Sequence, residues 1–269
     1  MNTFLQEAEA LERCASEERV SYLEAIGLAG SVLDVGCGNG YAVAEWRKRG
    51  VKAVGVDYSF YRASRWLAER SGSALVLADA TALPFRAGQF QATYSSGLIE
   101  HVGVEEQGGD VYRVTARPDK HEVRQQAVRE MCRVTSAGGS VILDFPNGMF
   151  PIDFWHGTSL GSFRVHGLPD TLNPSVWEIA RYLPDSRVTI LPLRNRLRFR
   201  QISRKWWGRA LHVPMKALIR LLDLLPRALR SIHGILYPFL VIRIRPARHG
   251  AKHGNAADSL IVFGSFTHR

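Results

Sequence analysis

The stretch SVLDVGCGNG, residues 31–40, decides the fold. It opens with an apolar run at 32–35, which is typical of a strand buried in a parallel sheet. Glycines then recur at every second position up to residue 40, and helix-forming residues follow over 41–49. A strand, a glycine turn and a helix in this order indicate an α/β unit whose turn binds a ligand against bare backbone.

Three further apolar runs follow, at a spacing that suits alternating strands and helices. The run 54–56 ends in Asp57, the run 74–78 ends in Asp79, and the run 90–94 leads into Ser95. Open α/β sheets bind ligands outside the carboxyl ends of their strands, so we expect these residues to share one edge with the glycine turn. A carboxylate at the end of the second strand can bind both hydroxyls of a ribose.

These four segments resemble the class I S-adenosylmethionine-dependent methyltransferases, specifically the type 11 group, over about residues 31–145. The resemblance implies an α/β fold with a doubly wound, mostly parallel seven-stranded sheet and helical additions, and it implies S-adenosyl-L-methionine as the cofactor. The dinucleotide-binding pattern G-x-G-x-x-G fits less well, because Tyr41 stands where its last glycine belongs.

The resemblance also assigns roles to individual residues. The three glycines would shape the loop around the methionine part of the cofactor, with Asp34 near its amino group, Asp57 at the ribose and Asp79 at the adenine amine. A buried acid at a strand end is in any case better explained by a ligand than by packing, because an unpaired buried carboxylate is costly. The expected cofactor-binding set is Asp34, Gly36, Gly38, Asn39, Gly40, Asp57, Tyr58, Asp79, Ala80 and Ser95.

Histidines are the candidates for removing the proton of an acceptor, because imidazole titrates near neutral pH. His101 follows the fourth strand, where the resemblance places the cofactor's methyl group, and we favour it for catalysis. His156 is the second candidate, and it lies with His166 in an aromatic segment over 149–170. The alternative for His101 is a structural role, since a Glu-His pair recurs in the type 11 group across different substrates. No His or Cys spacing matches a metal motif, so no metal is expected.

Composition favours one α/β domain in a reducing compartment. The chain has 269 residues, enough for a sizeable core without disulfides, and its three cysteines form no framework. The first residues are rich in glutamate and show no basic-then-apolar signal. The expected location is therefore cytoplasmic, without a signal peptide.

Basic charge is concentrated late in the chain. Residues 194–253 carry 15 Lys or Arg and a single acid, Asp223. Within 204–245, basic and leucine-rich positions separate on a helical wheel over 205–230, which predicts an amphipathic helix over 214–225, between two prolines. No run is long enough to span a bilayer. The segment can bind an anionic membrane surface, as a peripheral membrane protein does, or pack its apolar face onto the domain.

The sequence therefore predicts an S-adenosylmethionine-dependent methyltransferase that acts on a small or lipid-linked acceptor, at oxygen. The alternative is an RNA-modifying or RNA-binding protein that uses the basic segment, although leucine dominates where base-stacking aromatics would be expected. The predicted organisation is an N-terminal helical extension over 1–30, a cofactor-binding core over 31–194, a basic amphipathic helical insertion over 195–258 and a last core strand within 259–269.

Overall fold

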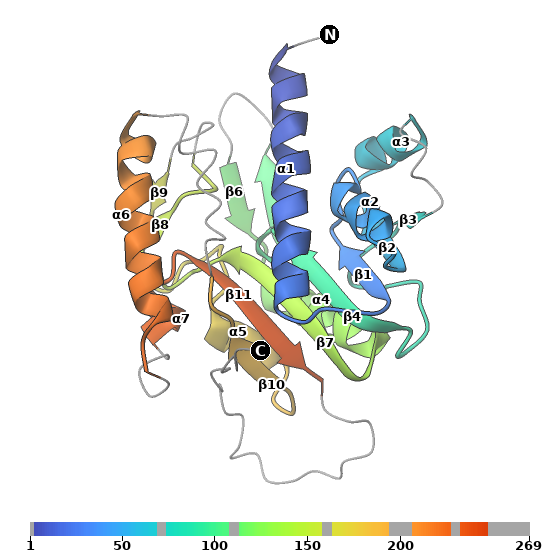
Figure 1. The fold of residues 1–269 in the computed structure, drawn as a ribbon. Helices are drawn as coiled ribbons and strands as arrows, with labels where there is room; N and C mark the ends of the chain where they lie inside the picture. The colour runs from blue at the N-terminus through green and yellow to red at the C-terminus, as the bar shows by residue number, and fades with distance from the viewer. Residues whose placement is uncertain are drawn as a thin grey trace. The chain divides into compact units, whose positions relative to one another are not determined.

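The computed structural model describes residues 3–68, 74–107, 113–157, 163–193, 206–226 and 232–246. Seven strands form one sheet in the order β10-β11-β7-β4-β1-β2-β3 (Figure 1). Strand β1 pairs in parallel with β2 and β4, β2 pairs in parallel with β3, and β10 is antiparallel to β11. The doubly wound, mostly parallel sheet expected from the sequence is confirmed. The strands are β1 (Val32–Val35), β2 (Ala53–Asp57), β3 (Leu75–Leu77), β4 (Phe90–Ser96), β7 (Thr135–Pro146), β10 (Arg187–Ile190) and β11 (Phe239–Arg245).

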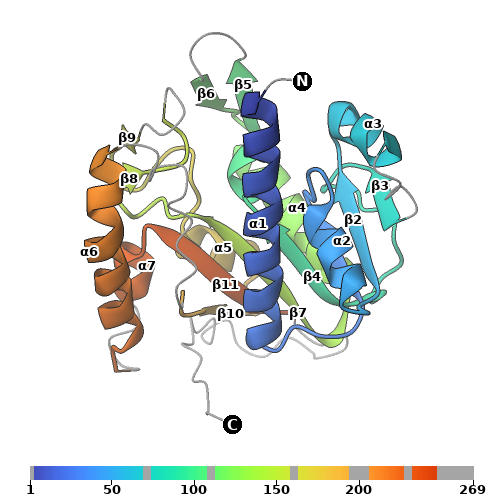
Figure 2. The same cartoon turned by 45° about the horizontal axis from the view of Figure 1, so that its top comes forward.

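The chain forms two compact units. Unit 1 comprises Met1–Ser96 and Ala127–Val141, and unit 2 comprises Gly97–Gln126 and Ile142–Arg269. The described part of unit 1 holds β1 to β4, part of β7, three whole helices and part of a fourth, and α1 lies beside α2 in both views (Figures 1 and 2). Helix α1 lies within the range 1–30 in which the sequence predicted an N-terminal helical extension. The helices of unit 1 are α1 (Thr3–Ala25), α2 (Tyr41–Lys48), α3 (Phe60–Ala68) and the second half of α4 (Lys120–Val134).

Close packing in unit 1 depends on Gly55, in the middle of β2. A Cβ atom at this position would lie 2.6 Å from Cδ2 of Leu75, 2.7 Å from Sγ of Cys37 and 2.8 Å from Cγ2 of Val43. These three side chains come from β3, from the glycine turn and from α2. Gly55 therefore lets the glycine turn and helix α2 pack directly against strand β2.

Replacing Gly55 by alanine should destabilise the protein, because three side chains would have to move at once. We expect a loss of about 1–3 kcal/mol in the free energy of unfolding, as for other overpacked cores. Urea denaturation measures this loss. The matched control is Gly167→Ala, where an added Cβ meets nothing within 4 Å. Equal stability of the two variants would contradict the packing argument.

Besides its share of the sheet and the first half of α4, the described part of unit 2 contains two short hairpins and four helical segments. Its helix α5 begins with a side-chain cap, since Oγ of Ser175 accepts a hydrogen bond from the amide of Glu178 at 3.1 Å. The α6 helix lies beside the β8–β9 hairpin in both views (Figures 1 and 2). The elements are η2 (Ile99–His101), β5 (Val104–Gln107), β6 (Arg113–Ala116), β8 (Ile152–Asp153), β9 (Arg164–Val165), α5 (Val176–Tyr182), α6 (Trp206–Asp223) and α7 (His233–Leu236).

The predicted boundaries of the insertion need correction. The sequence assigned 195–258 wholly to a helical insertion, but β11 lies within this range and takes a place between β10 and β7 in the sheet. Its residues FLVI form a continuous apolar run, which is what a strand buried on both faces requires. The strand predicted within 259–269 lies outside the described residues. The remaining domain boundaries stay predictions.

Helix α6 is longer than predicted, because it continues through Pro214 instead of beginning there. A proline inside a helix costs roughly 3 kcal/mol, since it removes one hydrogen bond and crowds the preceding turn. Burial offsets this cost on one face of α6, where Ile219 and Leu222 are 1% and 5% exposed. Met215 on the same face packs against the cluster around Phe154. None of the described helices is long and apolar enough to cross a membrane.

Candidate functional site

The glycine turn between β1 and α2 has a backbone conformation that residues with a side chain rarely adopt. The φ angles of Gly36, Gly38 and Gly40 are 77°, 59° and 78°. A Cβ atom at Gly40 would also lie 2.7 Å from Cδ1 of Leu75. Helix α2 begins at the next residue, so its first amide groups lack partners within the helix and can face an anionic or polar ligand.

Asp57 binds this turn from the end of β2. Its Oδ2 accepts a hydrogen bond from the amide of Gly38 at 2.9 Å, and its Oδ1 accepts one from the amide of Ser59 at 2.9 Å. The side chain is buried. Each carboxylate oxygen can accept a further hydrogen bond, so Asp57 can hold the turn and two ligand hydroxyls together.

Strand register brings the other predicted residues of unit 1 to the same edge. Val35 pairs with Val56 and with Ser95, and Asp57 pairs with Leu77, shortly before Asp79. Parallel strands that end together present their next residues along one edge of the sheet. The sequence-based placement of Gly36, Asp57, Asp79, Ala80 and Ser95 at one sheet edge therefore agrees with the register, although their roles toward a cofactor stay predictions.

These residues differ in exposure. Asp34 is buried within β1, and Ser95 is buried at the end of β4 with an Oγ that has no hydrogen-bond partner in the described part of the chain. Asp79 is exposed, and its Oδ1 accepts hydrogen bonds from the amide and the hydroxyl of Thr81 at 2.7 and 2.8 Å. Tyr58 is 75% exposed. Asp34 and Ser95 thus offer buried polar atoms, whereas Asp79 and Tyr58 lie at the surface.

Two residues that the sequence reasoning did not assign also contact the turn. Nε1 of Trp66 donates a hydrogen bond to the carbonyl of Gly38 at 2.9 Å, and Nδ2 of Asn39 donates one to Oε2 of Glu12 at 2.9 Å. Helical spacing predicts that Trp66 is buried, but it does not reveal which carbonyl the indole binds. No pattern in the sequence connects Glu12, in α1, with the turn.

Cys37 lies within the turn and is not suited to nucleophilic chemistry. Burial raises the pKa of its thiol well above the usual value, and the carboxylates of Asp34 and Asp57 raise it further. The thiol is therefore protonated at neutral pH, and only the thiolate is a strong nucleophile.

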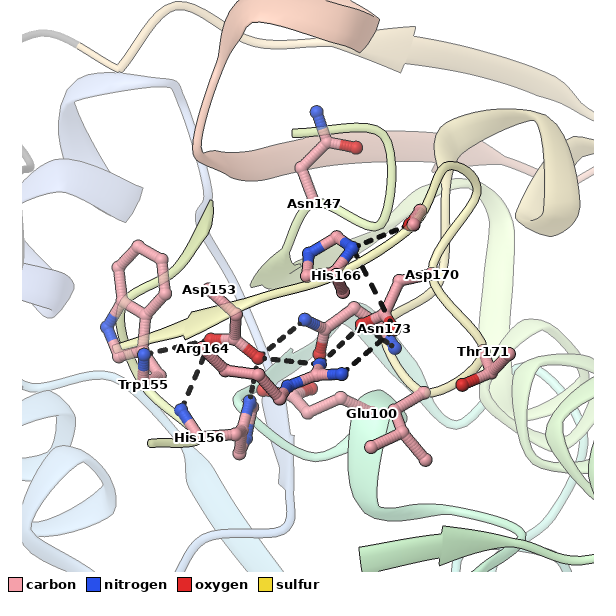
Figure 3. A network of polar contacts seen from close by, with 12 residues as sticks. Glu100, Asn147, Asp153, Trp155, His156, Arg164, His166, Asp170, Thr171 and Asn173 are labelled. Atoms are coloured by element: carbon pink, nitrogen blue, oxygen red, sulfur yellow. Dashed lines mark hydrogen bonds and ion pairs between the residues drawn. The ribbon is translucent and has the colours of Figure 1, made fainter. Parts of the chain in front are cut away.

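Unit 2 contains a second group of polar residues, centred on Asp153 (Figure 3). Oδ2 of Asp153 accepts hydrogen bonds from Nδ1 of His156 at 2.8 Å, from Nη2 of Arg164 at 3.0 Å and from Nδ2 of Asn173 at 2.8 Å. Its Oδ1 accepts hydrogen bonds from the amides of Trp155 and His156 at 2.9 and 3.2 Å. The imidazole of His156 is therefore fixed in one orientation.

A second carboxylate completes this network. Asp170 accepts hydrogen bonds from Nη1 and Nη2 of Arg164 at 3.0 and 2.5 Å, and one from the amide of Asn173 at 3.1 Å. Arg164 thus bridges the two aspartates. His166 lies beside it, with Nδ1 at 2.8 Å from the carbonyl of Gly167. Described residues at both ends of the aromatic segment therefore join in one hydrogen-bonded network.

The two predicted catalytic histidines lie together. The ring centres of His101 and His156 are 5.1 Å apart at an interplanar angle of 69°. Glu100 is adjacent, and one donor atom from each of the three residues lies within 4.8 Å of the others. Burial raises the pKa of Glu100, while the charges of His101 and His156 act in the opposite direction. An aspartate three residues before a histidine, as Asp153 stands before His156, is a signal in the sequence that could have shown that a carboxylate orients this imidazole.

Asp153 should make the stability of the protein depend on pH in acid. Burial alone would raise the pKa of its carboxyl, but the hydrogen bond and charge of His156 and the other donors hold this pKa well below its usual range. A carboxylate with a lowered folded-state pKa stabilises the fold above its unfolded-state pKa of roughly 3.9, and this contribution is lost as the pH falls further. Asp153→Asn should therefore be less stable at pH 7.

Urea unfolding between about pH 5 and pH 2 tests this prediction. The free energy of unfolding of the unchanged protein should fall more steeply with acidification than that of Asp153→Asn. The control is Asp185→Asn, at an exposed turn. Parallel pH profiles for the unchanged protein and Asp153→Asn would show that Asp153 is not a stabilising carboxylate.

The geometry of unit 1 defines a class of protein. A parallel sheet, a glycine turn before a helix and a strand-end aspartate bound to that turn are the parts of an α/β domain that binds a nucleoside cofactor. Residues 33–143 match the family model of the methyltransferase domain Methyltransf_11. The chain contains a class I S-adenosylmethionine-dependent methyltransferase domain of the type 11 group, and the cofactor of this domain is S-adenosylmethionine.

Known proteins resemble part of the chain. An uncharacterized methyltransferase of Mycobacterium sp. (strain JLS) is 32% identical over 115 residues, which are 43% of this chain and 38% of that protein. One of Mycolicibacterium vanbaalenii is 31% identical over 118 residues, with the same coverage. The match thus spans well under half the length of these relatives. The match to the crystal structure of geranyl diphosphate C-methyltransferase from Streptomyces coelicolor A3(2) covers 84% of this chain and 77% of that chain, at 17% identity and a TM-score of 0.44.

Proposed function

We propose that this chain transfers the methyl group of S-adenosylmethionine to an oxygen atom of a small or lipid-linked acceptor. The observation that carries the proposal is the contact between Asp57 and Gly38. In this contact, the buried carboxylate at the end of β2 holds a turn whose glycines have positive φ angles. The bare backbone of the turn fits the methionine part of the cofactor, Asp57 fits the ribose, and the buried hydroxyl of Ser95 offers a further polar contact.

When bound, the cofactor would supply an electrophilic methyl group: the C–S bond would break with its electron pair kept by sulfur as the C–O bond to the acceptor forms. The protein's part is to hold the two reactants in line, which can lower the barrier by roughly 7–11 kcal/mol. An acceptor hydroxyl must also lose its proton. Glu100, His101 and His156 are the residues we assign to this task, and Glu100 and His101 closely follow Ser95 along the chain.

The α6 helix supports a lipid-linked acceptor. Opposite the face that holds Ile219 and Leu222, it presents a second apolar stripe. The members of this stripe recur at helical spacing, and their exposed fractions are high: Trp206 75%, Val213 71%, Leu221 63% and, one residue beyond the end of the helix, Leu224 80%. Arg209 and Arg220 are exposed along one flank of the stripe. A helix with this pattern lies in the interface of an anionic membrane, its apolar stripe in the acyl boundary and its basic flank on the headgroups.

Labelled methyl transfer identifies the acceptor class. The protein is incubated with methyl-labelled S-adenosylmethionine and an extract of its source cells, and the label is then partitioned into organic, RNA and small aqueous fractions. We expect the label in the organic or the small aqueous fraction. Analysis of the labelled product should then find the methyl group in an ether or an ester. Label in RNA would replace this proposal with the RNA-modifying alternative.

Vesicle sedimentation tests the membrane surface separately. Leu221→Gln combined with Leu224→Gln should weaken binding to vesicles of anionic lipid by at least about 100-fold, because each buried leucine contributes roughly 1.5–3 kcal/mol. The matched control replaces Tyr61 and Leu77, two exposed apolar residues of unit 1. Arg209→Gln with Arg220→Gln should weaken binding by roughly 30-fold, at about 1 kcal/mol for each charge. Equal binding by all variants would remove the membrane from the proposal.

A further inference from the structure

Glu100 has the features of a metal-binding carboxylate. It is 5% exposed, and its Oε2 has no hydrogen-bond partner in the described part of the chain. A buried carboxylate oxygen without a partner costs free energy, so such groups normally accept hydrogen bonds or coordinate a metal. The backbone of Glu100 is held in place, since its carbonyl accepts a hydrogen bond from Nη2 of Arg124 at 3.1 Å.

The donor atoms around Glu100 are of the right kind. Together with His101 and His156 it forms a set of two imidazoles and one carboxylate, with one donor from each within 4.8 Å of the others. Two histidines and one carboxylate bind divalent transition metals such as Zn²⁺ in hydrolases and Fe²⁺ in oxygenases, and they leave coordination positions open. An oxygen cage for Mg²⁺ or Ca²⁺ would instead consist of carboxylates and carbonyls.

The surroundings of His156 are those of a metal-binding histidine. A ligating imidazole usually donates its other N–H to a carboxylate, which fixes the ring and makes it a better ligand. Asp153 accepts such a bond from Nδ1 of His156 at 2.8 Å, so coordination by His156 would use Nε2. Arg164 and Asn173 hold Asp153 in turn, through its Oδ2 at 3.0 and 2.8 Å. This outer shell is independent of the orphaned oxygen of Glu100.

We propose that Glu100, His101 and His156 bind one divalent transition-metal ion, with Asp153 as the residue that orients His156. Metal–ligand distances of about 2.0–2.2 Å place neighbouring donors roughly 3.4 Å apart. Because the donors now lie within 4.8 Å of one another, they approach by up to about 1.4 Å on binding. His101 and His156 are half-buried, so positions on the ion stay open for water or a hydroxyl. The role of the ion, though not its binding, rests on the proposed function: held by these three residues, the ion would bind the acceptor oxygen and make its proton easier to lose, so the residues would promote proton loss through the ion and not as direct bases.

Co²⁺ is the probe of this site, because its visible absorption reports nitrogen and oxygen ligands and distinguishes them from thiolate. The full chain is titrated with CoCl₂ and then with ZnCl₂ in the absence of cofactor. We expect one equivalent of Co²⁺ with no thiolate charge-transfer band, displaced by Zn²⁺. Glu100→Gln and His156→Ala should each weaken binding by more than 10-fold, and Asp153→Asn by about 10- to 100-fold, the usual effect of losing an outer-shell partner.

Two controls separate this inference from the proposed function. His121→Ala, an exposed histidine of α4, should bind Co²⁺ as the unchanged protein does. Asp57→Ala should also bind it fully while losing the cofactor. Glu100→Gln is nearly isosteric, and circular dichroism confirms that it folds. The inference is overturned if the unchanged protein binds neither Co²⁺ nor Zn²⁺, or if folded Glu100→Gln binds as tightly. Cofactor binding by the same samples then shows whether the methyltransferase proposal still stands.

Discussion

Replacing Asp57 by alanine should weaken the binding of S-adenosylmethionine by about 100-fold or more. The variant removes the charged acceptor of the Gly38 amide and of the ribose hydroxyls together. Hydrogen bonds to a charged group contribute roughly 1.5–3 kcal/mol each, and 1.4 kcal/mol is a factor of ten in affinity. Equilibrium dialysis with labelled cofactor measures the dissociation constant directly.

The matched variant Asp57→Asn keeps the size of the side chain and one acceptor oxygen but removes the charge. We expect it to fall between the unchanged protein and Asp57→Ala. Asp185→Ala, at an exposed turn, should bind the cofactor normally. If Asp57→Ala folds and keeps its affinity within about threefold, the assignment of the ribose site to Asp57 fails.

Replacing Arg124 by methionine should have the largest effect on stability. The guanidinium is fully buried and donates to the carbonyls of Val102 at 3.0 Å, Glu100 at 3.1 Å and Leu172 at 2.5 Å, and to Oε1 of Glu178 at 3.1 Å. Removing one partner of a buried ion pair costs about 3–5 kcal/mol, because it leaves the other charge uncompensated. For a chain of this size we expect the melting temperature to fall by roughly 10 °C.

Differential scanning calorimetry measures this change. The control is Arg129→Met, which alters an exposed arginine of the same helix and should leave the melting temperature within about 2 °C. The double variant Arg124→Met with Glu178→Met should recover part of the loss, because no buried charge remains unpaired. A small effect of Arg124→Met alone would mean that the carbonyls it binds find other donors.

The parts of the fold that the sequence predicts are those encoded over short distances. Each strand of unit 1 is an apolar run, and Gly36, Asp57 and Ser95 stand at the carboxyl ends of three of these strands, so parallel pairing alone brings these residues to one edge. Strand β11 was missed because its apolar run closely follows the basic amphipathic segment and was assigned to the same helical insertion. Its neighbours in the sheet, β7 and β10, are distant in sequence, and no local pattern announces them.

The candidate site shows the same limit. The sequence singles out His101 and His156 one at a time, by residue type and by position after a strand. Their contact joins residues from η2 and from the segment after β8, and the orphaned oxygen of Glu100 depends on burial that only the folded chain produces. Metal-ligand spacing gave no signal, because the three donors do not come from one helix or one hairpin.

The most direct measurement of the central claim is the amount of S-adenosylhomocysteine formed for each methyl group transferred, with the unchanged protein, the cofactor and the extract of its source cells. Our account predicts that S-adenosylhomocysteine accumulates only when the extract is present, one molecule for each labelled product, and that Asp57→Ala forms almost none. A protein that binds the cofactor yet forms no more S-adenosylhomocysteine than Asp57→Ala would contradict the account and make the domain a binding module.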